Sequence, residues 1–324
     1  MHVDLHIVLG GAVVGFLVGL TGAGGGALMT PMLILLFGIR PSTAISSDLV
    51  AAVFLRPMGA GVHIVGRTVN FRLVGWMVLG SVPMAFAGTY LLHLLGHAAA
   101  SEATVEKVLG AALLVGAAAM VLRYALDRRG GHERAGIVHG VVVRPIPTVA
   151  IGMAGGLLVG LTSVGSGSLI IVLLLFLYPV LGAGQLVGTD LTQAVPLTVA
   201  AALGALAFGH VEFLVTGSIL VGGVPAVLVG ALLSSRAPDR YIRPALAFVI
   251  FASGLRYVGV GATPLAWVLY AVLSGAAVAH LASARTRRSR PGPTEAGGPH
   301  ATAGHDAHRG RRPVYGDVGP AVLE

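Results

Sequence analysis

The chain has 324 residues, of which 55% are hydrophobic and only 10% are charged, and its formal net charge is +8. Soluble domains carry about 25% charged residues, so this composition excludes an ordinary soluble protein and indicates a lipid environment. The basic residues lie mainly in short loops and in the C-terminal tail, as orientation signals do, which argues against a nucleic-acid partner. Cysteine is absent, which excludes disulfides and thiolate metal sites.

Apolar segments, several of them about 20 residues long and able to cross a hydrocarbon core, recur from residue 5 to residue 281. The start of the chain lacks the basic residues of a cleaved signal peptide, so we expect the first apolar segment to be retained. The expected segments are 5–20, 27–38, 43–65, 71–95 and 104–124 in the first half, and 146–161, 168–182, 186–208, 213–234 and 241–258 in the second. They predict an all-α polytopic membrane protein.

An internal repeat relates the two halves. GFLVGLTGAGGG at 15–26 matches GLLVGLTSVGSG at 156–167, SDL at 47–49 matches TDL at 189–191, VNF at 69–71 matches VEF at 211–213, and GSVP at 80–83 matches GGVP at 222–225. Four blocks in the same order favour a duplication over a chance likeness between Gly-rich spans.

The first two segments of each half are short for separate crossings and too long together for one straight helix. A continuous helix from residue 5 to residue 38 would span about 50 Å. We therefore expect each pair to form a hairpin around a Gly-rich turn, followed by three crossings, which inverts the second half relative to the first. This topology places ten loop arginines on one side of the membrane and only Arg40, Lys107 and Arg256 on the other, as the positive-inside rule favours. Inverted repeats recur among secondary transporters.

The predicted organisation has five parts. They are a first transmembrane repeat over 1–124, a cytoplasmic linker over 125–145, a second repeat over 146–259, an extra transmembrane helix over 260–284 and a disordered basic cytoplasmic tail over 285–324. The N-terminus is expected outside and the C-terminus in the cytoplasm.

The two Gly-rich turns are candidate anion sites. Unwound backbone at membrane depth must be buried in protein or face water, and the helix that starts after each turn would direct free N–H groups toward it. The candidate substrate-binding residues in the turns are Thr21, Gly22, Gly24, Gly25, Gly26, Thr162, Ser163, Gly165, Ser166 and Gly167. The alternative is that the glycines only permit close helix packing. A dinucleotide fingerprint is a poor interpretation, because the flanks are membrane helices.

Ionisable residues within the segments are candidates for binding and coupling. A charge at membrane depth costs about 2.5–3.5 kcal/mol, so such a residue usually faces a cavity or a partner. Arg56, nearly on one helical face with His63, is the candidate for an ion pair with an anionic substrate. Asp48, His63, Asp190 and Gln193 are candidate coupling or gating residues. For the two aspartates, N-terminal helix capping is an open alternative.

With its two Gly-rich turns, each followed by an Asp near the next helix, the chain resembles the TauE/SafE family of sulfite exporters from about residue 12 to residue 259. The resemblance implies a polytopic protein of the bacterial inner membrane that exports small anions such as sulfite, sulfonates or sulfoacetate. Separately, we expect no cofactor and no metal site. The halves are not equivalent, because Ser163 and Ser166 replace glycines of the first turn and Arg56 matches Thr198.

Two other function classes make different demands. An intramembrane hydrolase would need Asp48 and Asp190 within hydrogen-bond reach of each other, and a metal-cation permease would need intramembrane clusters of Asp, Glu and His. The expected partners are a small anionic substrate and membrane lipids, with no nucleic acid, and a homo-oligomer is an open alternative to a monomer.

Overall fold

The computed structural model describes residues 5–21, 26–97, 102–130, 141–164, 167, 169–233, 239–270 and 274. The helices are α1 (Leu5–Thr21), α2 (Gly26–Phe37), α3 (Pro41–Val65), α4 (Phe71–His97), α5 (Glu102–Gly130), α6 (Pro145–Thr162), α7 (Leu169–Leu177), α8 (Ala183–Phe208), α9 (Phe213–Leu233) and α10 (Asp239–Val258). In the described part of the chain, six helices (α3, α4, α5, α6, α8 and α9) are long and apolar enough to cross a membrane. The prediction of an all-α polytopic membrane protein is confirmed.

The two short helix pairs form hairpins, as predicted. A Cβ atom added at Gly10, in α1, would contact the side chains of Met32, in the middle of α2, and of Phe37, its last residue. In the second pair, the hydroxyl of Tyr178, which follows α7, lies 2.6 Å from the hydroxyl of Thr148 near the start of α6. Each pair therefore returns to the end of the molecule at which it began. The predicted segment 168–182 is correspondingly shorter, because α7 ends at Leu177.

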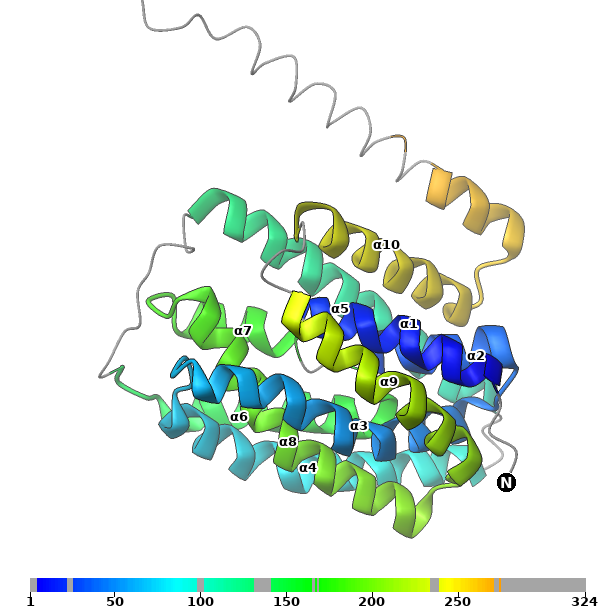
Figure 1. The fold of residues 1–324 in the computed structure, drawn as a ribbon, viewed down its shortest axis with the longest axis horizontal. Coiled ribbons are helices and arrows are strands. Elements are labelled where there is room, and N and C mark those ends of the chain that lie inside the picture. The colour runs from blue at the N-terminus through cyan, green and yellow to red at the C-terminus, as the bar shows by residue number, and fades with distance from the viewer. Residues whose placement is uncertain are drawn as a thin grey trace, which may run out of the picture. The chain divides into compact units, whose positions relative to one another are not determined.

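The two hairpins open at opposite ends of α3. The first hairpin leads directly into the start of α3, where the Ser42 hydroxyl donates to Glu102 at the start of α5 (2.7 Å). The second hairpin leads into α8, where a Cβ atom at Gly188 would contact His63 near the end of α3. The long helices run side by side between these two ends (Figure 1). The first hairpin therefore meets one end of α3 and the second hairpin meets the other.

Close contacts between helices of different halves hold the fold together. α1 packs along α9 and α6 packs along α4, which are equivalent pairs under the repeat. In α1, a Cβ atom at Gly15 would clash with the backbone of Gly223 in α9, and one at Gly19 with the backbone of Val227. In α6, a Cβ atom at Gly156 would clash with the backbone of Ser81 in α4, and one at Gly160 with the backbone of Ala85. These small-xxx-small faces let backbones approach closely, as in other membrane helix pairs. For these glycines, helix packing is the role that the structure shows.

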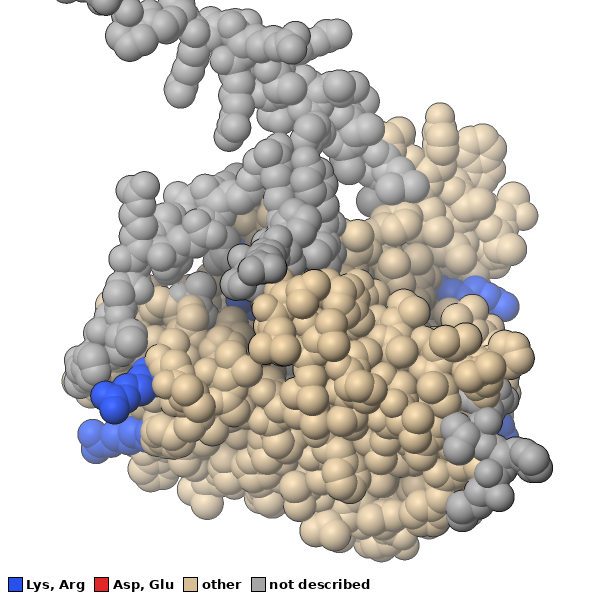
Figure 2. Space-filling model, viewed as in Figure 1, with Lys and Arg blue, Asp and Glu red and all other residues tan. Residues whose placement is uncertain are grey.

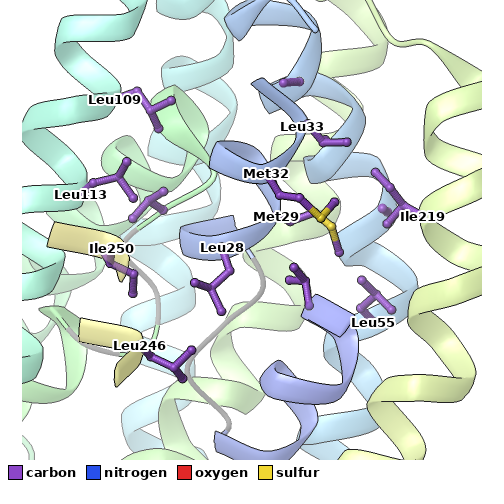
Figure 3. Packing of buried hydrophobic residues seen from close by; sticks show 14 of the residues in the cluster. Leu28, Met29, Met32, Leu33, Leu55, Leu109, Leu113, Ile219, Leu246 and Ile250 are labelled. Carbon is purple, nitrogen blue, oxygen red and sulfur yellow. The ribbon is translucent and has the colours of Figure 1, made fainter. Parts of the chain in front are cut away.

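The first part of helix α2, from Gly26 to Leu33, is largely enclosed by protein, whereas Leu35 and Leu36 near its end are exposed. With 12 residues the whole helix spans about 18 Å, too little to cross a hydrocarbon core of about 30 Å. Met29 and Leu33 are fully buried, and the surrounding cluster includes Leu55 of α3, Leu109 of α5 and Ile250 of α10 (Figure 3). Because other helices surround it, the first hairpin can end inside the molecule without exposing its backbone to lipid.

The outer surface of the described part fits a lipid environment. Large apolar side chains are widely exposed, such as Leu36 (74%), Ile146 (84%) and Leu232 (79%). Lys and Arg atoms gather toward the left and right ends of the face in Figure 2, where no Asp or Glu is visible. The helices of Figure 1 run between those two ends. The chain is therefore an integral membrane protein.

The chain divides into one compact unit over residues 1–271 and a second over residues 272–324. The predicted extra helix over 260–284 is described mainly at residues 262–270, which are helical. Most of the predicted linker, at 131–140, and the predicted tail over 285–324 lie outside the described residues.

Candidate functional site

Seven buried polar side chains lie between the two hairpins and the long helices that follow them. This set, which we call the polar centre, consists of Thr30, Asp48, Arg56, Ser81, Ser163, Asp190 and Gln193, and each member is at most 6% exposed. Both hairpins and helices from both halves contribute to it. Buried polar groups are costly unless they are paired, so the bonds within the centre indicate what it can bind.

Asp48 joins the two hairpins. Its Oδ2 atom accepts a hydrogen bond from Thr30 Oγ1 (2.9 Å) in α2 and another from Ser163 Oγ (2.8 Å), which follows α6. A Cβ atom at Gly26, the first residue of α2, would clash with the backbone carbonyl of Ser163. The inner ends of the two hairpins therefore meet beside this carboxylate.

Asp190 has a different environment. Its Oδ1 atom accepts a bond from Gln193 Nε2 (3.3 Å), and Gln193 Oε1 accepts one from Ser81 Oγ (3.1 Å). The backbone N–H of Gly167, in the second turn, also faces this carboxylate. Asp190 Oδ2 is buried and has no hydrogen-bond partner among the described residues. One oxygen of this carboxylate therefore remains available to another group.

Arg56 supplies the positive charge of the polar centre. Its side chain is 6% exposed, and its Nε and Nη1 atoms have no acceptor within the described part of the chain. Its electrostatic neighbours are Asp190 and Asp48. A buried guanidinium with unsatisfied donors is unfavourable by itself, and an oxyanion would satisfy those donors.

The capping interpretation of the two aspartates is wrong. Asp48 lies in the third turn of α3, whose N-cap is Arg40, and Asp190 lies in the third turn of α8, whose N-cap is Gly182. Neither N-cap residue makes a side-chain capping bond. Both carboxylates instead bond to side chains of the polar centre.

Two equivalent hydrogen bonds tie the halves together just beyond the aspartates. The backbone N–H of Glu212 donates to Ser47 Oγ (3.1 Å), and that of Asn70 donates to Thr189 Oγ1 (3.2 Å). Ser47 directly precedes Asp48, and Thr189 directly precedes Asp190. The repeat matches Ser47 with Thr189 and Asn70 with Glu212, so each bond is the counterpart of the other. We call them the end latches, because they lie toward opposite ends of α3.

Other predicted site residues have different surroundings. The Thr162 hydroxyl donates to the Leu158 carbonyl (2.7 Å), so its own helix uses its proton. The His63 ring lies 3.1 Å from the Thr68 hydroxyl, beyond the end of α3. His63 therefore lies near the end latch that Asn70 and Thr189 form. The predicted residues Gly22, Gly24, Gly25, Gly165 and Ser166, and the side chain of Thr21, lie outside the described residues.

Thr30 and Ser81 were not among the predicted site residues, although each makes a buried hydrogen bond in the polar centre. A search for every hydroxyl within the apolar segments would have found both, but it would have found many helix-bonded hydroxyls too. In the sequence, Ser47 and Thr189 stood out only as matched positions of the repeat, with no indication of a hydrogen bond.

The competing site types find no matching arrangement in the described part of the chain. Asp48 and Asp190 bond to separate sets of side chains, whereas an aspartyl hydrolase needs its carboxylates to share a proton. Within the same residues, no group of three or more His, Cys, Asp or Glu side chains could hold a metal ion.

Comparisons with known proteins identify the family. The family model described as sulfite exporter TauE/SafE matches residues 7–257. "Probable membrane transporter protein YjnA" of Bacillus subtilis (strain 168) is 38% identical over 256 residues, covering 79% of this chain and 100% of that protein. "Probable membrane transporter protein YdhB" of the same organism is 25% identical over 250 residues, covering 77% and 98%. No solved structure matches. The chain therefore belongs to the TauE/SafE sulfite exporter family and is a membrane transporter.

Proposed function

We propose that this transporter is a secondary exporter of small anions such as sulfite, sulfonates or sulfoacetate, acting in the bacterial inner membrane with its C-terminus in the cytoplasm. The observation that carries the proposal is the buried guanidinium of Arg56, whose Nε and Nη1 donors are unsatisfied. The family match gives the class of transported solute that this side chain would suit.

The shape of the guanidinium favours an oxyanion. Its planar fork can donate two parallel hydrogen bonds to a sulfonate, sulfite or carboxylate group. The helix that begins at Gly26 would direct its first N–H groups toward the same region. In this proposal the two Gly-rich turns complete the site around Arg56, and the hydroxyl of Ser163 holds Asp48 beside it.

The charge balance of the polar centre suggests coupling to protons. One guanidinium and two carboxylates leave one excess negative charge if all three groups are ionised, which would oppose an incoming anion. Protonation of a carboxylate would remove this opposition. Asp190 is the better candidate, since its Oδ2 atom has no partner while Asp48 Oδ2 accepts two hydroxyl bonds. The anion would then bind to the form of the polar centre in which Asp190 is protonated, so its affinity should rise as the pH falls.

The end latches provide the alternation of access that such a carrier needs. In the described arrangement both latches are formed, and Asp48 and Asp190 are each 1% exposed. We propose that release of the Ser47 latch opens the polar centre toward one side of the membrane and that release of the Thr189 latch opens it toward the other.

Transport in proteoliposomes tests this function. Labelled sulfite, an alkylsulfonate, sulfoacetate and a divalent cation would be supplied with and without a pH gradient. We expect anion flux that depends on the gradient, its loss in Arg56→Ala and partial retention in Arg56→Lys, which keeps the charge but not the fork. Flux of the divalent cation without anion flux would show a metal-cation permease instead.

A further inference from the structure

We propose that a cavity at the start of α3 is a second, outer anion-binding site, which the substrate occupies on its way to or from the polar centre. This inference rests on the proposed anion transport. The cavity, which we call the α3-start cavity, has a volume of about 170 Å³, and its polar lining includes Arg40, Ser42, Ser46, His93, Glu102 and His210. No member of this lining belongs to the polar centre.

The cavity leads from the surface toward the buried site. Arg40 and His210 are exposed, whereas Ser46 is only 1% exposed. Ser46 is followed in α3 by Ser47, which forms an end latch, and by Asp48 of the polar centre. Since a water molecule needs about 10–15 Å³ of such space, the cavity has room for a small anion with part of its hydration shell.

The chemistry of the lining favours an anion. The acidic side chain of the lining, Glu102, is already engaged, because its two oxygens accept bonds from the Ser42 hydroxyl (2.7 Å) and the Ser42 N–H (3.3 Å). The lining also carries the Arg40 guanidinium, whose five N–H groups can donate to an oxyanion. A metal ion is a poorer fit, since no metal-binding group of three side chains occurs among the described residues.

An end latch separates the cavity from the polar centre. His210, in the lining, and Glu212, which donates to Ser47, belong to the same short connection between α8 and α9. A Cβ atom at Gly209 would contact the hydroxyl of Ser46, so this connection also lies against the inner end of the cavity. Release of the Ser47 latch would therefore join the α3-start cavity to the polar centre.

The lining has no chemical equivalent at the other end of the molecule. At the offset of 142 that relates the halves, His93 matches Ser235 and Glu102 matches Pro244. The outer site is thus a property of one membrane face, and it should affect substrate binding from that face alone.

The test compares Arg40→Gln, Arg40→Lys and the control Lys107→Gln in oriented proteoliposomes with labelled sulfite. Lys107 is an exposed cation of α5 outside the lining. We expect Arg40→Gln to raise the KM for sulfite about tenfold, the worth of one charge-assisted hydrogen bond, when sulfite is supplied on the face bearing Arg40. The maximal rate, and the thermal stabilisation of purified protein by saturating sulfite, should change little. Arg40→Lys should restore part of the KM, and Lys107→Gln should leave it unchanged.

Two results would overturn the outer site while leaving the proposed function intact. One is sulfite transport by Arg40→Gln with the KM of the wild type, and the other is an equal rise of KM in Lys107→Gln, which would indicate general surface charge. Absence of anion transport in the wild type would instead overturn the proposed function, and the outer site with it.

Discussion

The helix scaffold and the polar centre differ in how far they preserve the repeat. In the scaffold, the contact of Gly19 with Val227 has an equivalent in that of Gly160 with Ala85, and the two end latches are also equivalent. In the polar centre, Arg56 has Thr198 as its counterpart, and the hydroxyl of Thr198 only bonds back to carbonyls of its own helix.

The difference follows from what each region requires. Close backbone approach admits only the smallest residues on both copies of a helix pair, so the scaffold glycines recur. A second buried guanidinium near the first would add desolvation and repulsion without a second substrate to offset them. We infer that the scaffold keeps the repeat because both halves must move alike, while the polar centre has lost it because one anion needs one cation.

The largest expected effect concerns the scaffold. Gly19→Leu and Gly160→Leu should each destabilise the protein by about 3 kcal/mol or more, because each side chain would be forced into a facing backbone. The yield and thermal midpoint of purified protein would measure the loss. If the scaffold is equivalent in both halves, the two substitutions should be similarly harmful.

Gly75→Leu and Gly217→Leu are the matched controls. Both glycines lie in membrane helices, and a Cβ atom at either position meets nothing within 4 Å. They should therefore be tolerated, since the leucines would face open space. Intolerance of all four leucines would show that glycine at these positions is needed for a reason other than helix packing.

Membrane sidedness gives an all-or-none test of the relation between the halves. Because the chain has no cysteine, single cysteines can be introduced at Arg67, Lys107, Arg144 and Arg256, which are exposed. In intact cells an impermeant maleimide should label the cysteines that replace Lys107 and Arg256 but not those that replace Arg67 and Arg144. Labelling of the Arg67 and Lys107 variants from the same side would contradict the inverted topology.

Hydroxyls of the polar centre should matter more than hydroxyls of the scaffold. Thr30→Val and Ser163→Ala each remove one bond to Asp48 and should cost about 1.5–3 kcal/mol, the range for hydrogen bonds to charged groups. Thr198→Val removes only bonds to its own helix, so it should cost less than about 0.5 kcal/mol. Thermal unfolding of the three variants measures the difference. Equal costs would mean that Asp48 is not held by these two hydroxyls.

The smallest stability effects are expected at the end latches. Ser47→Ala and Thr189→Val each remove one neutral hydrogen bond, worth about 0.5–1.5 kcal/mol. Their effect on access should be clearer, and a single cysteine that replaces the buried Ala51 would report it. In Ser47→Ala this cysteine should react faster with a maleimide supplied on the Lys107 side. In Thr189→Val it should react faster with a maleimide supplied on the Arg67 side. Unchanged reaction rates in both variants would show that the latches do not control access.

Much of the fold could be predicted from the sequence, because apolar length and the repeat are one-dimensional signals. The hairpins followed from segments too short to cross, and the Gly15 and Gly156 faces followed from the matched glycines. The swapped packing of α1 on α9 and α6 on α4 could not be predicted, since spacing along one helix does not reveal which helix lies opposite.

The site was predicted in part. Arg56, Asp48 and Asp190 stood out because ionisable residues are rare in apolar segments, and all three lie in the polar centre. Their bonding could not be predicted, because Thr30 and Ser163 reach Asp48 across the sequence. His63 shares a helical face with Arg56 by spacing, yet it bonds to Thr68 in a loop, because seven residues are about 10 Å along a helix.

Anion-dependent thermal stabilisation of purified protein tests the central claim most directly. The variants are wild type, Arg56→Gln and the control Arg72→Gln, whose arginine is exposed at the start of α4. Because Arg56→Gln leaves the carboxylates of Asp48 and Asp190 without their buried cation and should lower the stability of the protein, each unfolding temperature is compared with that of the same variant without anion, which separates loss of ligand binding from loss of structure. We predict that sulfite or a sulfonate raises the unfolding temperature of wild type and of Arg72→Gln but not that of Arg56→Gln. Equal stabilisation of all three proteins would contradict the account, because the anion would then bind without the guanidinium of Arg56.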